Sequence, residues 1–193
     1  MYGFDKEEIT QIIISMLVVA VAFSAQYLFA SKIAFAAVFP VILLGVGTGF
    51  VLHELAHKFV AIKLGAFARY QAWETGLLMA LVMAFATGGR FVFAAPGAVY
   101  IYAPVLSRKK NGYISIAGPL TNLLVGLFFM VIGLVLPDGY LSFAALSVAS
   151  INFFLGFFNM IPIPPLDGSK VLAWNVAAWI ALIIPLGILT FFF

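Results

Sequence analysis

Two histidines four residues apart are the residues of this 193-residue chain whose types and spacing point most directly to chemistry. His53 and His57 are the only histidines, and they lie in the run Val-Leu-His-Glu-Leu-Ala-His-Lys-Phe. On a helix this spacing places both imidazoles on one face, which suits two ligands of a tetrahedral zinc ion. Glu54 lies about 100° around the helix, where it can reach a metal-bound water without ligating the metal. The bland alternative is a pair of histidines that hydrogen-bond between helices, with the glutamate as a partner.

A third protein ligand must come from an acidic residue. The sequence has no cysteine and no further histidine, and catalytic zinc usually takes three protein ligands. Asp167 stands out because it ends the run Asn-Met-Ile-Pro-Ile-Pro-Pro-Leu-Asp-Gly at residues 159–168. Three prolines prevent a regular helix there, and the carbonyls that they free need a wet or protein-lined site. The alternative for Asp167 is a solvated turn or a helix N-cap.

The composition places these residues in a membrane protein. Of all residues 65% are hydrophobic and 9% are charged, and the mean hydropathy is +1.17. A soluble domain is roughly half apolar and a quarter charged. A water-soluble, disordered, collagen-like or disulfide-stapled chain is therefore excluded. The net charge is +3, and the basic residues lie mostly between apolar runs, so no nucleic-acid partner is expected.

Five apolar runs are long enough to cross a bilayer as helices, which takes about 20 residues. They are residues 9–30, 38–64, 116–136, 141–161 and 171–193. The second run carries both histidines. We expect residues 1–193 to form a single integral membrane domain, an all-α polytopic fold with about five to six transmembrane helices.

The stretch 76–104 is also apolar, but Thr-Gly-Gly-Arg at 87–90 and Ala-Pro-Gly at 95–97 interrupt it. Its second half is rich in valine and aromatic residues, which suit extended structure. The expected elements are a helix at 77–86, strands near 91–94, 98–102 and 113–116, and a hairpin turn at 107–112. Because non-helical backbone at membrane depth must line protein or water, we expect a re-entrant or interfacial β-hairpin element rather than another span.

The basic residues favour the same arrangement. If 76–104 does not cross and the N-terminus is cytoplasmic, Lys32 alone lies outside. The bases on the inner face are then Lys6, Lys58, Lys63, Arg69, Arg108, Lys109, Lys110 and Lys170. A single crossing by 76–104 would divide the bases nearly evenly, against the positive-inside bias. We therefore expect a multi-pass protein of the cell membrane whose N-terminus and active-site end are cytoplasmic, with Asp167 on the side of the histidines.

The paired motifs resemble those of the site-2 protease family of intramembrane zinc metalloproteases. In this chain they are His53-Glu54-Leu55-Ala56-His57 and the run from Asn159 to Gly168, and Gly118-Pro119-Leu120-Thr121-Asn122 matches a GPxxN element common in the family. The chain departs from the family at Ser169, where glycine is common and where the hydroxyl is expected to cap the next helix.

The resemblance implies one Zn²⁺ per chain, held by His53, His57 and Asp167, with Glu54 as catalytic base. Zinc lowers the pKa of bound water toward about 7, so a carboxylate can accept its proton and pass it to the leaving amine. Asn159 and Asn122 are candidate donors to the oxyanion. Hydrogen bonding between helices is the other role open to both asparagines.

The expected substrate is a transmembrane protein or peptide segment, which must unwind before hydrolysis. An exposed strand edge within 91–102 could hold its extended form by β-augmentation; the alternative is a purely structural hairpin. Two further functions stay open: a non-proteolytic metal-binding membrane protein or transporter, which would not need Glu54, and a scaffold for transmembrane helices. Nothing in the sequence indicates an oligomeric state.

Overall fold

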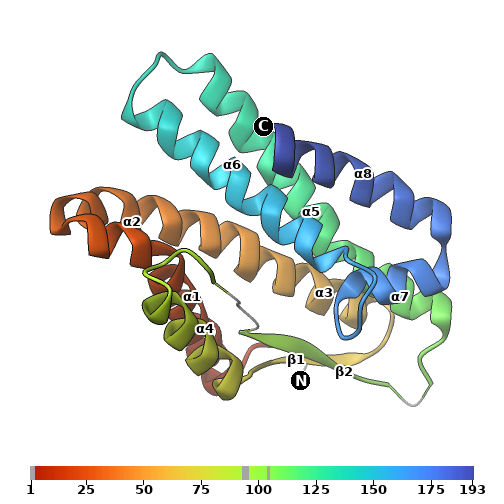
Figure 1. Ribbon diagram of the computed structural model, residues 1–193. Coiled ribbons are helices and arrows are strands. Elements are labelled where there is room, and N and C mark those ends of the chain that lie inside the picture. Colours follow the sequence, from red (N-terminus) through yellow and green to blue (C-terminus); the bar gives the residue numbers. More distant parts are fainter. Residues whose placement is uncertain (1–2, 93–95, 104) are drawn as a thin grey trace.

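The fold is a bundle of apolar helices with a small sheet at one end (Figure 1). The computed structural model describes residues 3–92, 96–103 and 105–193. In chain order its elements are α1 (Lys6–Ala30), α2 (Lys32–Val46), η1 (Gly47–Val51), α3 (Leu52–Lys63), β1 (Phe67–Ala72), α4 (Glu74–Ala86), β2 (Gly97–Tyr102), α5 (Arg108–Val135), α6 (Tyr140–Asn159), α7 (Asp167–Trp174) and α8 (Val176–Phe192). The mostly helical architecture with one antiparallel strand pair confirms the predicted fold class.

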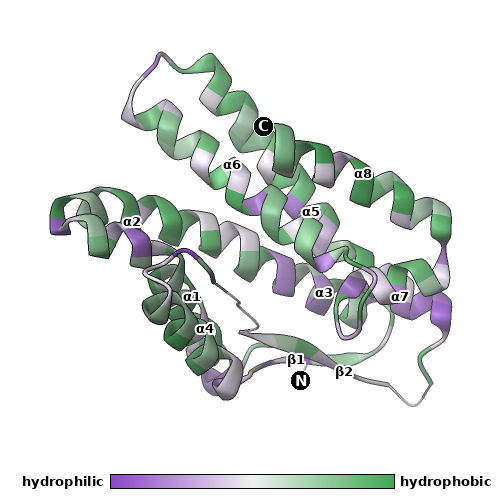
Figure 2. Cartoon of the chain, in the orientation of Figure 1, coloured by the Kyte–Doolittle hydropathy of each residue, from purple (hydrophilic) through white to green (hydrophobic). Residues whose placement is uncertain are grey.

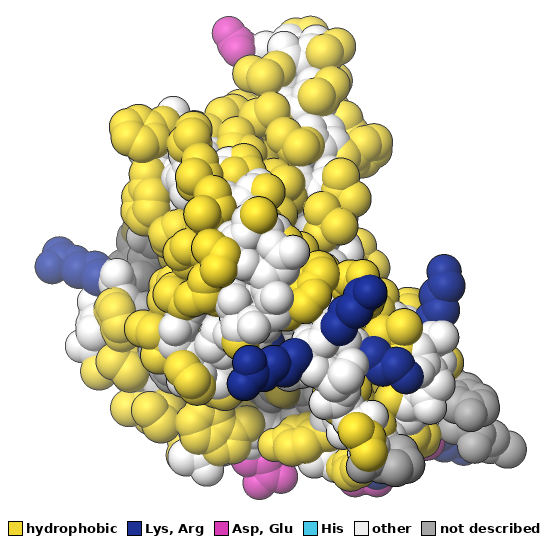
Figure 3. Space-filling view, turned by 90° about the vertical axis from the view of Figure 1, so that its right-hand side faces the viewer, with side chains coloured by type: hydrophobic (Ala, Val, Ile, Leu, Met, Phe, Trp, Pro, Cys, Tyr) yellow, Lys and Arg dark blue, Asp and Glu magenta, His cyan; other side chains and the backbone are white. Residues whose placement is uncertain are grey.

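Four helices are long and apolar enough to cross a membrane. They are Lys6–Ala30, the continuous helix Lys32–Lys63 formed by α2, η1 and α3, Arg108–Val135 and Tyr140–Asn159. Hydrophobic residues cover the bundle, and more polar residues gather at the lower end of α3 and on α7 (Figure 2). In the space-filling view, Lys and Arg side chains gather on the lower part of the face, below a mainly hydrophobic surface (Figure 3). The chain is therefore a helical membrane protein.

The last predicted span, residues 171–193, is wrong as a single helix. It divides at Asn175 into α7 and α8, and α8 has 17 residues. The side chain of Asn175 accepts a hydrogen bond from the N–H of Ala178, so this residue begins a new helix instead of continuing the old one.

The predicted helix at 77–86 and the predicted strand at 98–102 are confirmed as parts of α4 and β2. The predicted partner of that strand is wrong. Strand β2 pairs antiparallel with β1, from Phe67 opposite Tyr102 to Ala72 opposite Gly97. Residues 91 and 92 are not in a strand, and residues 93–94 of that predicted strand lie outside the described residues.

The predicted strand at 113–116 and its turn at 107–112 are also wrong, because both belong to the start of α5. The hydroxyl of Ser107 accepts a hydrogen bond from the N–H of Lys110, which caps the helix. A helix begun there runs on through Tyr-Ile-Ser-Ile, whose strand preference is a weak local effect.

A wide helical turn lies directly before the histidines. Residues Gly47–Val51 form a π-helix, η1, between α2 and α3. Within it the hydroxyl of Thr48 donates to the carbonyl oxygens of Leu44 (2.9 Å) and Gly45 (3.1 Å). A side chain thus supplies a donor to these helix carbonyl oxygens. A Cβ atom at Gly49 would lie 2.8 Å from Leu155 Cδ1, so the missing side chain lets η1 approach α6 closely. Such π-turns occur frequently beside functional sites.

Candidate metal centre

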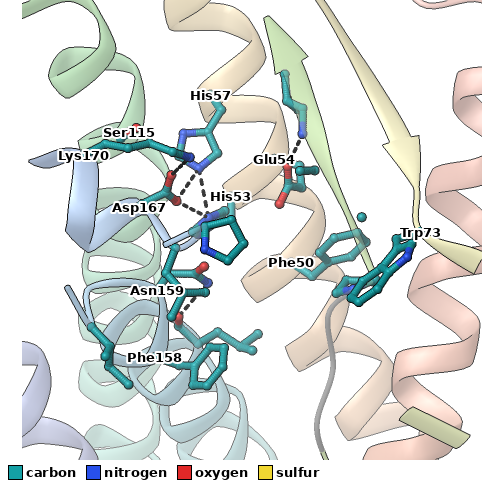
Figure 4. Close-up of a pocket in the computed structure, with 18 of the residues that line it drawn as sticks. Phe50, His53, Glu54, His57, Trp73, Ser115, Phe158, Asn159, Asp167 and Lys170 are labelled. Atoms are coloured by element: carbon teal, nitrogen blue, oxygen red, sulfur yellow. Dashed lines mark hydrogen bonds and ion pairs between the residues drawn. The ribbon is translucent and has the colours of Figure 1, made fainter. Parts of the chain in front are cut away.

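The side chains of His53, His57 and Asp167 meet at one point in the protein interior (Figure 4). The histidines come from α3, and the aspartate is the first residue of α7, directly after the proline-rich loop. The Nε2 atoms of the two histidines are 3.0 Å apart, and Asp167 Oδ2 lies 2.9 Å from Nε2 of His57 and 3.3 Å from Nε2 of His53. The three residues are only 3%, 6% and 8% exposed, respectively. The structure thus brings together the three residues predicted as ligands.

The other ring nitrogen of each histidine has a hydrogen-bond acceptor as its partner. His53 Nδ1 lies 2.6 Å from Asn122 Oδ1, and His57 Nδ1 lies 2.7 Å from the carbonyl oxygen of Ile114. The Asn122 amide is oriented by its own NH₂ group, which donates to the carbonyl oxygen of Gly49 at 2.7 Å. Both rings therefore donate from Nδ1, and both Nε2 lone pairs face the centre.

This donor set fits a metal ion. Two Nε2 lone pairs and a carboxylate oxygen are three acceptors facing one another, so a cation, either a proton or a metal ion, is needed between them. Their separations of 2.9–3.3 Å are close to the edge of about 3.3 Å expected for tetrahedral zinc with Zn–N distances of about 2.0–2.1 Å. Ring nitrogens oriented by a buried amide or carbonyl are also the usual surroundings of metal-bound histidine.

Glu54 lies beside this centre and is not part of the ligand cluster. Its Oε2 accepts a hydrogen bond from the backbone N–H of Val99 in β2, at 3.0 Å. A cavity of about 580 Å³, within the usual range for ligand sites, opens between α3, β2 and the segment 158–167. Its walls are mainly apolar and include Phe50, Trp73 and Phe158, whereas Glu54 and the three ligand candidates supply polar groups.

Comparison with known proteins identifies the family. The chain is 41% identical over 186 residues to the "Putative zinc metalloprotease MJ0611" of Methanocaldococcus jannaschii, and the match covers 96% of this chain and 93% of the relative. The model of peptidase family M50 matches residues 137–186. The chain belongs to this family. It is also 31% identical over 156 residues to the "Putative zinc metalloprotease YwhC" of Bacillus subtilis, across 69% of this chain and 68% of that relative. No solved structure matches. The resemblance to the site-2 protease family is thereby confirmed.

The two candidate asparagines of this M50 family member occupy different places. Asn122 is fully buried behind His53, and its NH₂ donates to Gly49 O and, at 3.3 Å, to Asn152 Oδ1. Asn159 lines the cavity and donates to the carbonyl oxygen of Leu155 in its own helix at 3.0 Å. Only Asn159 therefore stands where a substrate can reach it.

Asn152 is a polar residue of the site that sequence reasoning missed. It is fully buried in α6, where its NH₂ donates to the hydroxyl of Thr48 at 3.0 Å and to the carbonyl oxygen of Val148. A buried polar chain thus runs from His53 through Asn122 and Asn152 to the π-helix. The available signal was its spacing, because an asparagine seven residues before Asn159 in an apolar helix lies on the same helix face.

Ser169 of this M50 family member does not have the predicted role of a helix cap. Its hydroxyl donates to the carbonyl oxygen of Leu166 at 2.7 Å and does not cap the helix by accepting an N–H. The next residue, Lys170, lines the cavity, and its Nζ lies 3.4 Å from Asp167 Oδ1, whereas the histidines contact Oδ2.

Gly118 has no side chain, and this leaves open the space that the two Nε2 atoms face. A Cβ atom at this residue would lie 2.5 Å from Nε2 of both His53 and His57. We therefore expect Gly118→Ala to reduce the zinc content of the purified protein to about a tenth or less, because a methyl group occupies the position of the ion. Gly47→Ala is the matched control, since its Cβ would meet only Met16 Sδ at 3.5 Å. Full zinc content in a folded Gly118→Ala protein would contradict this assignment.

Proposed function

We propose that this M50 family member is a zinc metallopeptidase that hydrolyses a peptide bond in or near a transmembrane segment of a membrane-protein substrate. The observation that carries the proposal is the convergence of His53, His57 and Asp167 beside Glu54 at a cavity between apolar helices. The names of the two relatives, both zinc metalloproteases by description, support the same activity. A binding protein or transporter would not need a carboxylate at the position of Glu54.

In the proposed mechanism His53, His57 and Asp167 hold one Zn²⁺ per chain. The bound ion supplies Lewis acidity and lowers the pKa of water. The chain's own residues orient the ligands and move the proton. Asn122 and the carbonyl of Ile114 keep the imidazoles of His53 and His57, respectively, in the orientation that directs Nε2 inward. The carboxylate of Glu54 accepts a proton from the attacking water and delivers it to the leaving amine. Asn159 is the candidate donor to the developing oxyanion, because it lines the cavity.

The edge of β2 that faces away from β1 pairs with no other strand among the described residues, and this free edge is the proposed binding site for the extended substrate. The N–H of Val99 points away from β1, because it donates to Glu54. Alternate residues of a strand share an edge, so main-chain groups of Gly97 and Ile101 also face away from β1. All three residues line the cavity. A substrate segment added to this edge as a strand would place its peptide bonds next to Glu54, which deepens the β-augmentation hypothesis for this region.

The proposed activity is tested by removing the metal. Incubation of the purified protein with a zinc chelator should lower cleavage of a model transmembrane substrate by about a hundredfold or more, because the water loses its activation. Adding Zn²⁺ back should restore cleavage, as measured by separating products on a gel. Cleavage that persists in protein shown to be zinc-free would reject the metallopeptidase proposal.

The proposed orientation keeps the N-terminus and the active-site end in the cytoplasm. Because the chain has no cysteine, single cysteines can be placed at will. An Asp138→Cys protein, changed in the loop between α5 and α6, should react with a membrane-impermeant maleimide on intact cells. A Lys109→Cys protein, changed at the opposite end of α5, should react only after lysis. The reverse labelling pattern would overturn the orientation.

A further inference from the structure

Polar side chains of α1 cover the outer edge of β1. The N–H of Tyr70 donates to Glu8 Oε1 at 2.8 Å, and the N–H of Ala72 donates to Gln11 Oε1 at 2.9 Å. Both N–H groups point away from β2, because they belong to the residues of β1 that do not exchange hydrogen bonds with it. One edge of the two-stranded sheet is thus closed by α1, and the other edge faces the cavity.

Glu8 also joins this sheet to the helix of the metal centre. Lys58, the residue after His57, donates to both carboxylate oxygens of Glu8, at 2.7 and 2.5 Å. The two side chains are 2% and 1% exposed, and Lys58 Nζ lies 3.8 Å from the ring centroid of Phe4. Burying an ion pair is costly and is weak evidence for a gain in stability. The better reason for an ion pair at this place is that it fixes the position of Glu8 relative to Lys58.

These contacts connect the helix of the proposed catalytic base, α3, to both strands of the sheet. Glu54 and Lys58 are four residues apart and so lie on one face of α3. Glu54 contacts β2 through the N–H of Val99, and Lys58 contacts β1 through Glu8. The same helix face therefore holds both strands. Tyr70 makes a second contact between β1 and α1, because its hydroxyl donates to Ser15 Oγ at 2.9 Å. Burial raises the pKa of this hydroxyl, so it stays a neutral donor.

We propose that Glu8 and Gln11 are positioning residues that hold the sheet against α3, so that the free edge of β2 is aligned with Glu54 and with an extended substrate. The inference rests on the proposed function for the use of that edge, but the alignment itself is a property of the free protein. Neither residue touches the reacting atoms; each acts through a backbone N–H of β1.

A matched pair of double variants separates positioning from the mere presence of an ion pair. Glu8→Gln/Lys58→Met removes both charges and keeps an acceptor for the N–H of Tyr70. Glu8→Leu/Lys58→Met removes the same charges and the acceptor as well. For a transmembrane substrate we expect the leucine variant to raise KM by about tenfold, with kcat within about threefold of wild type and zinc unchanged, because alignment of the bound strand is lost. The glutamine variant should stay within about threefold of wild type in both constants.

Gln11→Leu is a single substitution that guards against misfolding of the double variants. It removes the acceptor for the N–H of Ala72 and, besides that, an exposed hydrogen bond to Glu7 of 3.3 Å within α1. It should raise KM in the same direction, and Thr10→Val, which alters a hydroxyl bonded within its own helix, should not. Equal losses of kcat and of zinc in both double variants, or an unchanged KM in the leucine variant and in Gln11→Leu, would overturn the proposal.

Hydrogen exchange supplies a readout that does not depend on cleavage. The amides of residues 97–102 should exchange faster in the leucine variant than in the glutamine variant, whereas those of residues 52–63 should not change. Equal exchange of the strand in the two variants would overturn the positioning role. Wild-type protein that holds zinc but cleaves nothing would instead count against the proposed function alone.

Discussion

Glu54→Gln should lower cleavage of a transmembrane substrate by about 10²- to 10⁴-fold, the usual contribution of a general base, while zinc content stays at the wild-type level. Glutamine has the shape of glutamate but cannot accept the proton of the attacking water. Its side-chain oxygen can still accept the N–H of Val99, which Glu54 accepts at 3.0 Å, so the position of β2 should be retained. Single-turnover cleavage and metal analysis of the same preparation measure both quantities.

Glu74→Gln is the control for this substitution. It neutralises another carboxylate, exposed at the start of α4, and should leave cleavage unchanged. Wild-type cleavage by a zinc-loaded Glu54→Gln protein would contradict the assignment of the base. A metal-binding protein without peptidase activity would show no Glu54-dependent turnover at all, so the comparison separates a peptidase from a non-proteolytic metal-binding protein.

Asp167→Ala should weaken zinc binding by more than about a hundredfold, because loss of a ligand costs more than the 10- to 100-fold typical of the groups that support ligands. The substitution also leaves the two Nε2 atoms, 3.0 Å apart, without the carboxylate that lies 2.9 and 3.3 Å from them. Titration with a competing zinc chelator measures the affinity. Cleavage at saturating zinc tests separately for activity.

Asp138→Ala is the matched control, since it removes an exposed aspartate from the loop between α5 and α6. Unchanged zinc affinity in Asp167→Ala would remove this residue from the ligand set. Asp167→Asn, which keeps the shape and loses the charge, should fall between the alanine variant and wild type.

The metal centre was predictable to the extent that it rests on local geometry. His53 and His57 are one helical turn apart, so the sequence alone places them together. Asp167 required an argument about which ends of the spans lie on one side of the membrane, and the structure brings it to the histidines. The roles of these residues as ligands and of Glu54 as base stay predictions.

Contacts between distant segments account for what sequence reasoning missed. The strand partner of β2 precedes α4 in the chain, and nothing local in Phe67–Ala72 specifies pairing with Gly97–Tyr102. Gly118 acquires its role only when α5 packs against α3, and Asn152 only when α6 packs against α5 and η1. The wrong strand at 113–116 shows the converse, because a local preference was overridden by a helix already capped at Ser107.

The ligand candidates also have a thermodynamic consequence. His53 and His57 belong to the first half of the chain and Asp167 to the second, so an ion shared by them is a cross-link between α3 and α7. Binding to the native state alone adds about 2.7 kcal/mol of stability when the free ion is at a hundred times its dissociation constant. The unfolding temperature should then depend on the free zinc concentration. At low free zinc, the packing of α7 against α3 should weaken before any single helix unfolds.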